Sequence, residues 1–373
     1  MIIFDFFDTI AFIICITTVI FLMAFSLMYT FKRKDFYKES KIKHRFAVLV
    51  PAYKDDEYII PTVRSLMRQE YPLDCYEIIV IADHLHPDTI LQLSQLPITL
   101  IQGNFKKSSK TKSLKAATKV LNENMYDIAV ILNADNLTDT DFLDKINNIY
   151  SAGSTAIQTH RVRQERPTCL AVIDAVSDEI DNSIIRCGHV AAGLSSSLNG
   201  SGMAFDYSWF KTNINKIKDD EDEKALESLL LKERIFIDYL DDTYTYAIKV
   251  GNRNKFYNQQ TYWIYAQYRS FFKNVKHLPN ALLSGNFDYA DRIIHWGILS
   301  KGLLIGIIVF FGIICIFIEW SLSIKWWILF IIVMFSMAMA IPDYLVDKKF
   351  NKAMKLSPFI GIKLLFKMIF NIK

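Results

Sequence analysis

The hydrophobic positions of the chain form two kinds of pattern: long continuous runs near both ends, and short runs between polar stretches in the middle. Three runs reach the length of about 20 mostly apolar residues that a helix needs to cross a bilayer. They are residues 10–31, 302–318 (with an approach at 296–300) and 326–346. The first is too long for a signal-peptide core, has no base before it and has no small-x-small site after it, so we expect a retained anchor.

The first part of residues 45–285 alternates between short Val/Ile runs and stretches in which apolar residues recur every three or four positions. Continuous Val/Ile runs are typical of parallel strands covered on both faces, and the periodic stretches are typical of the covering helices. The predicted strands are 45–53, 76–83, 98–103 and 127–135, and the helices between them are 57–69, 86–96 and 110–123. We therefore predict an α/β domain with a Rossmann-like, mostly parallel sheet.

The Lys and Arg residues predict how the long runs cross the membrane, because basic residues concentrate on the cytoplasmic side. Asp5 and Asp8 precede the first run without any base, whereas residues 32–44 after it are strongly basic. The loop 319–325 between the last two runs has one Lys, and several Lys follow the third run. We expect the N-terminus outside, the middle of the chain in the cytosol, a short hairpin across the membrane, and the tail inside.

These patterns divide the chain into five parts. They are a transmembrane anchor (1–31), a basic juxtamembrane linker (32–44), a cytosolic α/β domain (45–285), an interfacial helix with a transmembrane hairpin (286–347) and a basic amphipathic tail (348–373). The interfacial segment and the tail combine an apolar helix face with a narrow polar stripe, which is typical of helices lying in the plane of the membrane surface.

Composition adds little to this division. Hydrophobic residues make up 51% of the 373 positions, and the three long runs account for the excess over a soluble protein. The five Cys residues show no CxxC or other ligand-like spacing, so we expect free thiols and no zinc. The basic juxtamembrane runs suit anionic lipid, and we expect no nucleic-acid partner.

Polar side chains follow three predicted strands, at the edge where open parallel sheets bind ligands. Tyr53 and Asp55 follow the first strand, Asp83 ends the second, and residues 133–136 end the fourth. The small Ala52 and the ring of Tyr53 suit a flat nucleotide base, whose imide N–H Asp55 can accept. A plain strand-to-helix loop with acids at the helix start explains the same residues.

Lysines gather before and at the start of the helix predicted at 110–123. They are Lys106, Lys107, Lys110 and Lys112. Cations at a helix N-terminus oppose the helix dipole, so their placement is easier to understand if they meet an anion such as a diphosphate. A solvated basic face is the alternative.

The stretch LNADN at 132–136 offers oxygen ligands. A divalent cation that bridges protein and diphosphate needs only one or two carboxylates, and Asp135 can be one of them. Asn133 is neutral, although its carbonyl oxygen can touch a metal or accept a hydrogen bond from a ribose hydroxyl.

Three later segments carry further candidate chemistry. Gly200 and Gly202 flank Ser201 and let the backbone approach a sugar closely, or form a simple turn. The acids within 219–227 offer a general base, although acids at a helix start also stabilise its dipole. Residues 258–269 combine amides and aromatic rings, which suit stacking on sugars or helix packing near a membrane.

Taken in this order, these segments resemble the membrane-bound family 2 glycosyltransferases of the GT-A fold, a group that includes the chitin-oligosaccharide, hyaluronan and cellulose synthases. The resemblance spans about 45–300. It implies a metal-dependent, inverting transfer of a sugar from a nucleotide-diphosphate sugar, by family habit UDP-linked. It also implies a multi-pass protein of the bacterial inner membrane with its catalytic domain in the cytosol.

The resemblance assigns roles residue by residue. The implied nucleotide-binding residues are Ala52, Tyr53, Asp55, Asp83, Lys110 and Asn133. Asp135 is the implied ligand of Mg²⁺ or Mn²⁺, and Glu223 or Asp222 is the implied catalytic base. The implied acceptor-binding residues are Gln158, His160, Gly200, Ser201, Gly202, Gln259, Tyr262 and Trp263.

The chain departs from the family pattern at three chemically central positions. Asn133 stands where the family has an Asp, and the acidic pair is reversed to Asp222-Glu223. Tyr262 replaces an Arg that faces the diphosphate, so a cation that stabilises the leaving group is missing there. Lysines compensate in part, because Lys binds phosphate as a point charge.

The sequence therefore predicts a glycosyltransferase that acts on a saccharide or lipid-linked acceptor at the membrane. The alternative is a catalytically weakened homologue that binds nucleotide or a partner synthase. A nucleotidyltransferase shares the sheet but needs a Gly-rich loop after the first strand, which the chain lacks. Three spans are few to enclose a polymer channel, so a homo-oligomer, a partner membrane protein or a lipid-linked acceptor is expected.

Overall fold

A computed structural model of the protein describes residues 2–32, 37–248, 253–356, 359–360 and 363. The chain forms two compact units. The sheet unit consists of Lys34–Glu165 and Leu194–Lys249, and the helical unit consists of Met1–Arg33, Arg166–Gly193 and Val250–Lys373. The continuous range 45–285 expected for one cytosolic domain is thus shared between the two units.

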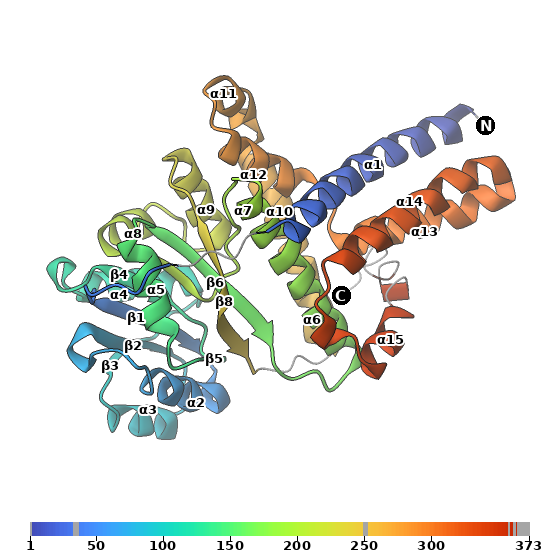
Figure 1. The fold of residues 1–373 in the computed structure, drawn as a ribbon. Coiled ribbons are helices and arrows are strands. Elements are labelled where there is room, and N and C mark those ends of the chain that lie inside the picture. Colours follow the sequence, from blue (N-terminus) through green and yellow to red (C-terminus); the bar gives the residue numbers. More distant parts are fainter. Residues whose placement is uncertain (1, 33–36, 249–252, 357–358, 361–362, 364–373) are drawn as a thin grey trace. The chain divides into compact units, whose positions relative to one another are not determined.

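An eight-stranded mixed sheet forms the centre of the sheet unit, in the order β3-β2-β1-β4-β7-β6-β8-β5 (Figure 1). The strands are β1 (Phe46–Tyr53), β2 (Tyr76–Asp83), β3 (Thr99–Gly103), β4 (Ile128–Ile131), β5 (Asn136–Thr138), β6 (Ala156–Arg163), β7 (Met203–Asp206) and β8 (Asp238–Ala247). Strands β1 to β4 pair in parallel, as do β6 and β8, whereas β7 is antiparallel to β4 and β6. The predicted Rossmann-like α/β sheet is confirmed, with antiparallel strands added.

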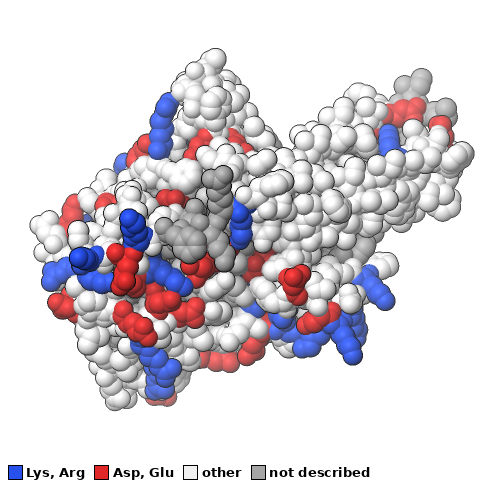
Figure 2. Space-filling view, in the orientation of Figure 1, with Lys and Arg blue, Asp and Glu red and all other residues white. Residues whose placement is uncertain are grey.

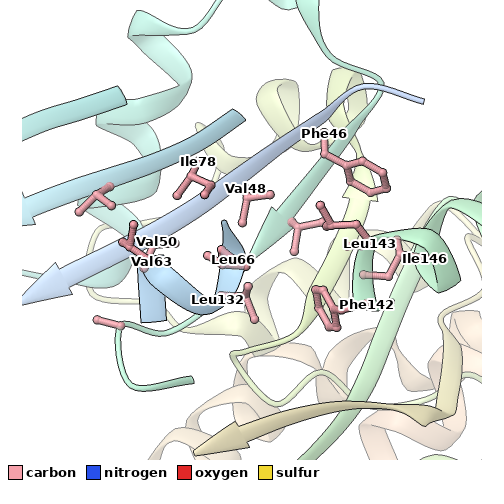
Figure 3. Packing of buried hydrophobic residues seen from close by; sticks show 14 of the residues in the cluster. Phe46, Val48, Val50, Val63, Leu66, Ile78, Leu132, Phe142, Leu143 and Ile146 are labelled. Carbon is pink, nitrogen blue, oxygen red and sulfur yellow. The ribbon is translucent and has the colours of Figure 1, made fainter. Parts of the chain in front are cut away.

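Helices cover both faces of this sheet. They are α2 (Asp56–Leu66), α3 (Pro87–Ser94), α4 (Lys110–Val120), α5 (Phe142–Ser151), α8 (Tyr207–Ile214) and α9 (Glu223–Lys232), with 3₁₀ turns η1 (Leu73–Cys75) and η2 (Glu123–Met125). Alternate residues of β1 face opposite sides. Phe46, Val48 and Val50 pack with Val63 of α2 and Phe142 of α5 in one buried cluster (Figure 3).

The first three predicted strands are confirmed almost to the residue, but the fourth is shorter than the predicted 127–135. Strand β4 ends at Ile131. Beyond it, Leu132 N still donates to Leu49 O, but Asn133 N donates to the Ser201 hydroxyl instead of to a strand. The LNADN stretch is therefore a loop at the carboxyl end of the sheet, where its polar side chains are available to a ligand.

The helical unit contains every candidate membrane span of the described residues. Its elements are α1 (Ile2–Thr30), α6 (Cys169–Asp181), π-helical η3 (Asn182–Cys187), α7 (Gly188–Ala191), α10 (Arg253–Asn274), η4 (Val275–His277), α11 (Leu278–Leu283), α12 (Phe287–Gly297), α13 (Lys301–Ile318), α14 (Trp320–Met339), η5 (Asp343–Leu345) and α15 (Lys348–Met354). The remainder of the predicted amphipathic tail lies largely outside the described residues.

Three of these helices are long and apolar enough to span a membrane: Phe4–Thr30 of α1, Lys301–Ile318 and Trp320–Met339. Few charged side chains interrupt their surface on the face that Figure 2 shows. The second matches the predicted run 302–318 to within one residue, whereas the first begins six residues before the predicted run 10–31. The predicted third run, 326–346, is wrong in its bounds, because the helix starts six residues earlier and ends at Met339.

The predicted loop 319–325 is also wrong, because α14 is helical from Trp320 onward. Two polar residues of this segment have partners on neighbouring helices of the helical unit. Ser323 Oγ donates to Gly312 O of α13 at 2.8 Å, and the Lys325 ammonium pairs with the carboxylate of Asp8 on α1. Hydropathy alone misplaces the start of α14, because Lys325 lowers the mean hydropathy of a segment that is helical in the structure.

Candidate active site

The carboxyl ends of β1 and β2 place the first candidate residues side by side. Tyr53 and Asp83 are register partners in this parallel pair, and so are Ala52 and Ala82. Both strands turn sharply at this point, because Lys54 and His84 have positive φ angles of 52° and 55°. Lys54 N donates to Asp83 O at 3.2 Å, which ties the two turns together.

Asp83 is almost fully buried at this edge, with 1% of its surface exposed. His84 Nδ1 lies 2.6 Å from Asp83 Oδ1, whereas no side chain or backbone group of the described residues hydrogen-bonds to the buried Asp83 Oδ2. A buried carboxylate oxygen without a donor is costly. Its geometry suits an incoming N–H group, and the half-exposed ring of Tyr53 beside it offers a flat face.

Asp55 lies at the entrance of the following helix. It is the residue before α2 and makes no side-chain capping bond to that helix, although its carbonyl accepts from Ile59 N at 3.0 Å. The sequence alternatives for Asp55, base recognition or a favourable charge at a helix start, both stay open.

Lys110 is the residue that connects the LNADN loop with the Gly-Ser-Gly loop. It opens α4, where Ser109 caps the helix by accepting from Lys112 N at 3.2 Å. Lys110 Nζ donates to Asn133 Oδ1 at 2.7 Å and also to Gly200 O. The half-buried Lys112 points elsewhere, since its Nζ donates to Lys107 O.

Burial lowers the pKa of Lys110 from 10.5 to about 8. Arg161 acts in the same direction, while the carboxylates of Glu223 and Asp135 oppose the change. A cationic Lys110 is thus surrounded by two acids and one further cation. The four side chains come from four separate segments of the sheet unit, which is the arrangement expected of a charged ligand site and not of a solvated surface.

Glu223 approaches this cluster from the start of α9. A Cβ atom added at Gly200 would lie 3.3 Å from Glu223 Oε2, so the carboxylate rests against the backbone of Gly200. Gly200 has a positive φ of 86°, which favours glycine. The carbonyl of the same residue accepts from Lys110, and Glu223 therefore lies beside the lysine that also holds Asn133.

Asp222 occupies a different position from its neighbour. It caps α9, accepting from Lys224 N at 3.1 Å, and its carboxylate lies 3.6 Å from Lys224 Nζ. Burial raises the pKa of Asp222, and the charge of Glu223 adds to this, whereas Lys224 opposes it. For Lys224, burial would lower the pKa, but Glu223, Asp222 and Glu227 outweigh burial and raise it.

The Gly-Ser-Gly loop is held by buried hydrogen bonds. Ser201 Oγ donates to Asn136 Oδ1 at 2.9 Å and accepts from Asn133 N at 3.0 Å. Gln158 Nε2 donates to Ser201 O at 2.9 Å and to Asn199 Oδ1 at 3.0 Å, and Gln158 is fully buried. Gln158 therefore supports the Gly-Ser-Gly loop from a buried position. Its predicted contact with an acceptor stays a prediction.

His160 lies on the next strand position but faces β8. Its Nδ1 is 3.2 Å from Asp241 Oδ1, and its ring contacts Tyr239 and Tyr244. The pairing of β6 with β8 shifts register between Thr159 and His160, which leaves room for these contacts.

The described residues fit a metal held mainly by a substrate. They contain no group of three or more His, Cys, Asp or Glu side chains that would form a protein cage for an ion. Asp135 provides one carboxylate at the end of the sheet, and the Asn133 amide oxygen is engaged by Lys110. One or two protein oxygens suffice for a divalent ion whose other ligands are phosphate and water.

Gln259, Tyr262 and Trp263 lie on α10 of the helical unit, whereas all the other predicted site residues belong to the sheet unit. Tyr262 is more than half exposed. Their assignment to an acceptor site stays a prediction.

Sequence reasoning missed Arg161, and it placed Asn136 in the polar cluster 133–136 without a role. Arg161 belongs to the segment THRVR, where only its residue type and its position on a strand could have indicated a functional role. Asn136 follows the LNADN aspartate directly, but its buried bond to Ser201 depends on a contact 65 residues away in sequence.

The comparisons with known proteins agree with this geometry. Residues 44–213 match the model of a protein family described as glycosyltransferase like family 2. A comparison with curated proteins finds no match. Among solved structures, the chain is similar to the mannosyltransferase PcManGT from Pyrobaculum calidifontis, in complex with GDP-Man and Mn²⁺, at 14% identity and a TM-score of 0.64, covering 98% of this chain and 99% of that one.

A second solved structure, residues 1–349 of S. aureus TarS, matches at 14% identity and a TM-score of 0.47, covering 88% of this chain and 92% of that one. The family match covers the LNADN loop, Lys110 and the Gly-Ser-Gly loop, and the mannosyltransferase likeness extends the shared fold over nearly the whole chain. This chain therefore carries a glycosyltransferase family 2 domain with the GT-A fold.

Proposed function

We propose that the protein transfers a sugar from a nucleotide-diphosphate sugar to a hydroxyl group of a saccharide or lipid-linked acceptor, with inversion at the anomeric carbon. The observation that carries this proposal is the convergence on Lys110. The amide of Asn133, the backbone of Gly200 and the carboxylate of Glu223 meet around one half-buried lysine. A donor diphosphate and a general base need this proximity, because transfer requires both at one carbon.

The nucleotide is held at the neighbouring strand ends. The orphaned Asp83 Oδ2 accepts an N–H of the base, while Ala52 and Tyr53 border its flat face and Asp55 lies beside them. The donor panel in a test includes UDP-sugars, from the family resemblance, and GDP-mannose, because the mannosyltransferase of the same fold is in complex with it.

Lys110 and Asn133 bind the diphosphate side of the nucleotide, and Asp135 would hold Mg²⁺ or Mn²⁺ together with phosphate and water oxygens. When bound, the divalent ion neutralises phosphate charge and so assists departure of the nucleoside diphosphate. The mannosyltransferase of the same fold is in complex with Mn²⁺. The Asp135 carboxylate is the one protein anion of the LNADN loop that can serve this purpose.

Glu223 removes the proton of the acceptor hydroxyl. The acceptor oxygen then forms a bond to the anomeric carbon as the bond from that carbon to the diphosphate oxygen breaks. The proton goes to the Glu223 carboxylate, and the nucleoside diphosphate leaves with the electron pair of the broken bond. Glu223 is placed for this role beside Gly200, whereas Asp222 is occupied in capping α9.

The acceptor lies against the Gly-Ser-Gly loop, and the assignment of Gln259, Tyr262 and Trp263 to acceptor binding rests on the family resemblance. The protein crosses the bacterial inner membrane with this site in the cytosol, a proposal that the three candidate spans and the basic residues beside them support. Reporter fusions after residues 40 and 319 test that topology, since a cytosolic enzyme reporter is expected to be active only at the first position.

The central experiment is release of nucleoside diphosphate by the detergent-purified full chain from a panel of UDP-sugars and GDP-mannose with Mn²⁺. Asp135→Ala is expected to lose turnover, and a matched surface change, Asp88→Ala, is expected to keep it. Absence of turnover with every donor, in the protein itself and in Asn133→Asp, excludes the proposed function. Nucleotide binding without any turnover would support the weakened homologue instead.

A further inference from the structure

The two oxygens of the Asp83 carboxylate have different surroundings at the end of β2. Oδ1 lies 2.6 Å from His84 Nδ1 and also accepts a longer bond, of 3.5 Å, from the backbone N–H of Phe105. An ionised carboxylate only accepts hydrogen bonds, about two at each oxygen, so His84 donates and the two donors occupy Oδ1. Oδ2 is buried and receives no hydrogen bond from the residues that the structure describes. Asp83 therefore has one oxygen left for a ligand.

The backbone holds both donors of Oδ1 in place. His84 has a positive φ of 55°, at the sharp turn that follows β2. The Phe105 ring packs on Gly103, the register partner of Asp83 on β3, because a Cβ atom added at Gly103 would lie 2.6 Å from Phe105 Cε2. The occupation of Oδ1 thus follows from the way in which two neighbouring strands end.

Two partly exposed rings lie beside this carboxylate. Tyr53 is the register partner of Asp83 on β1 and is 48% exposed. The His84 side chain is 39% exposed, and its ring meets the Tyr53 ring edge to face, with the centroids 5.8 Å apart. A flat base in contact with these rings lies next to Asp83, where Oδ2 is the acceptor for an N–H group of its edge.

Nucleobases differ in the N–H groups that they present on the Watson–Crick edge, which proteins read by hydrogen bonding. Uracil has one N–H between two carbonyl oxygens, whereas guanine has two adjacent N–H donors. A carboxylate with both oxygens available matches two adjacent donors through parallel hydrogen bonds. With Oδ1 occupied, Asp83 leaves the second donor of guanine without an acceptor, which is costly in a buried site. Cytosine has no N–H on the corresponding ring nitrogen, so two acceptors would face each other.

We propose that His84 determines the base specificity of the donor site, acting through Asp83. By occupying Oδ1 it leaves Asp83 a single acceptor, which selects uracil over guanine and cytosine. The inference rests on the proposed function and narrows its donor to a uridine-diphosphate sugar. Asp83 makes the contact with the base, and His84 positions Asp83 and needs no contact of its own with the nucleotide.

The test measures binding of UDP, GDP and CDP with Mn²⁺ to the detergent-purified full chain, by calorimetry or by thermal stabilisation. The unaltered protein is expected to bind UDP at least about tenfold more tightly than GDP or CDP, because a buried donor or acceptor without a partner costs about that factor. In His84→Gly the ratio of UDP to GDP affinity is expected to fall about tenfold, since both oxygens of Asp83 become available to guanine. Glycine adopts the positive φ of position 84 without strain, so the turn is retained.

His86→Ala is the matched control, because His86 follows two residues later, its side chain is 70% exposed and it makes no side-chain capping bond to α3. The control is expected to keep the UDP-to-GDP ratio of the unaltered protein.

Two outcomes overturn the inference. One is an unaltered protein that binds GDP or CDP as tightly as UDP, and the other is an unchanged UDP-to-GDP ratio in His84→Gly, including an equal loss of both affinities. If His84→Gly does not fold, His84→Phe decides, because it keeps a ring and removes the N–H: a lowered ratio supports the inference and an unchanged ratio overturns it. Failure of the unaltered protein to bind any nucleotide refutes the proposed function itself.

Discussion

Lys110 Nζ donates a 2.7 Å hydrogen bond to Asn133 Oδ1. Asn133 stands where the family pattern has a second carboxylate, so the lysine binds an amide oxygen at this position. The amide accepts this bond without a net charge, and burial keeps the pKa of Lys110 near 8. An Asp at this position would form an ion pair with the same lysine. The departure from the family pattern thus bears both on the proposed metal site and on the charge that faces Lys110.

Asn133→Asp is expected to tighten Mn²⁺ binding in the presence of nucleoside diphosphate by about tenfold, because ligand charge sets divalent-ion affinity. It is also expected to raise the pKa of Lys110, since an adjacent anion favours the ammonium form. Metal titration of enzyme activity or of UDP-dependent thermal stabilisation measures the first effect. Asn124→Asp, on an exposed turn, is the control, and equal Mn²⁺ affinity in Asn133→Asp and the protein would refute the assignment.

The lowered pKa of Lys110 predicts a loss of donor binding in alkaline solution. Below pH 8 the lysine is cationic and holds the diphosphate, and above pH 8 it is neutral in the free protein. We expect kcat/KM for the donor to fall about tenfold per pH unit above this value. Lys110→Arg is expected to remove the alkaline fall, whereas Lys112→Met should leave it in place. A profile that stays flat to pH 10 in the unaltered protein contradicts the prediction.

The lowered pKa of Lys110 also affects the free energy of unfolding, and this contribution increases with pH. Between about pH 8 and the unfolded value of 10.5, the unfolded chain binds a proton at Lys110 that the folded chain has lost. Stability contributed by this group therefore rises with pH through that window. Comparison of thermal unfolding in Lys110→Met and the protein at pH 7.5 and pH 9.5 isolates the contribution, and the variant is expected to gain relative stability at the lower pH.

Much of the fold follows from local patterns in the sequence. The strands at 45–53, 76–83 and 98–103 are continuous Val/Ile runs, and the structure pairs them in parallel as expected. Parallel strands have their carboxyl ends at one edge of the sheet, which brings Tyr53 next to Asp83 and places the LNADN loop on the same edge. These positions are decided by strand direction, which short-range periodicity encodes.

Other features depend on contacts that no local pattern encodes. The end of β4 at Ile131 is set by the Ser201 hydroxyl, which binds Asn133 N from 68 residues away. Hydropathy counts Lys325 against the helix that starts at Trp320, whereas in the structure Lys325 pairs with Asp8, more than 300 residues away in the sequence. Glu223 and Asp222 are adjacent acids in the sequence, and only the fold separates a carboxylate beside Gly200 from a helix cap.

The different positions of Glu223 and Asp222 predict different effects of similar substitutions at the two residues. Glu223→Gln is expected to reduce kcat by about 10²–10⁴ with nucleotide affinity retained, because it removes a general base and keeps the side-chain size. Asp222→Asn is expected to reduce kcat by less than about tenfold, since Asn caps helices as well as Asp does. Single-turnover rates with saturating donor compare the two. A larger loss in Asp222→Asn would assign the base to Asp222.

The apolar helices contain one buried carboxylate, and its removal is expected to loosen their packing. Asp8 of α1 is 1% exposed, accepts from Trp326 Nε1 at 2.8 Å and pairs with Lys325, both on α14. Asp8→Ala leaves that lysine and indole without an acceptor, which is expected to cost about 3–5 kcal/mol in unfolding free energy. Asp8→Leu with Lys325→Leu should recover part of this, because no uncompensated charge remains. Unfolding in mixed detergent micelles measures the changes against Asp5→Ala, and equal stability of Asp8→Ala and Asp5→Ala would contradict a structural role for the pair.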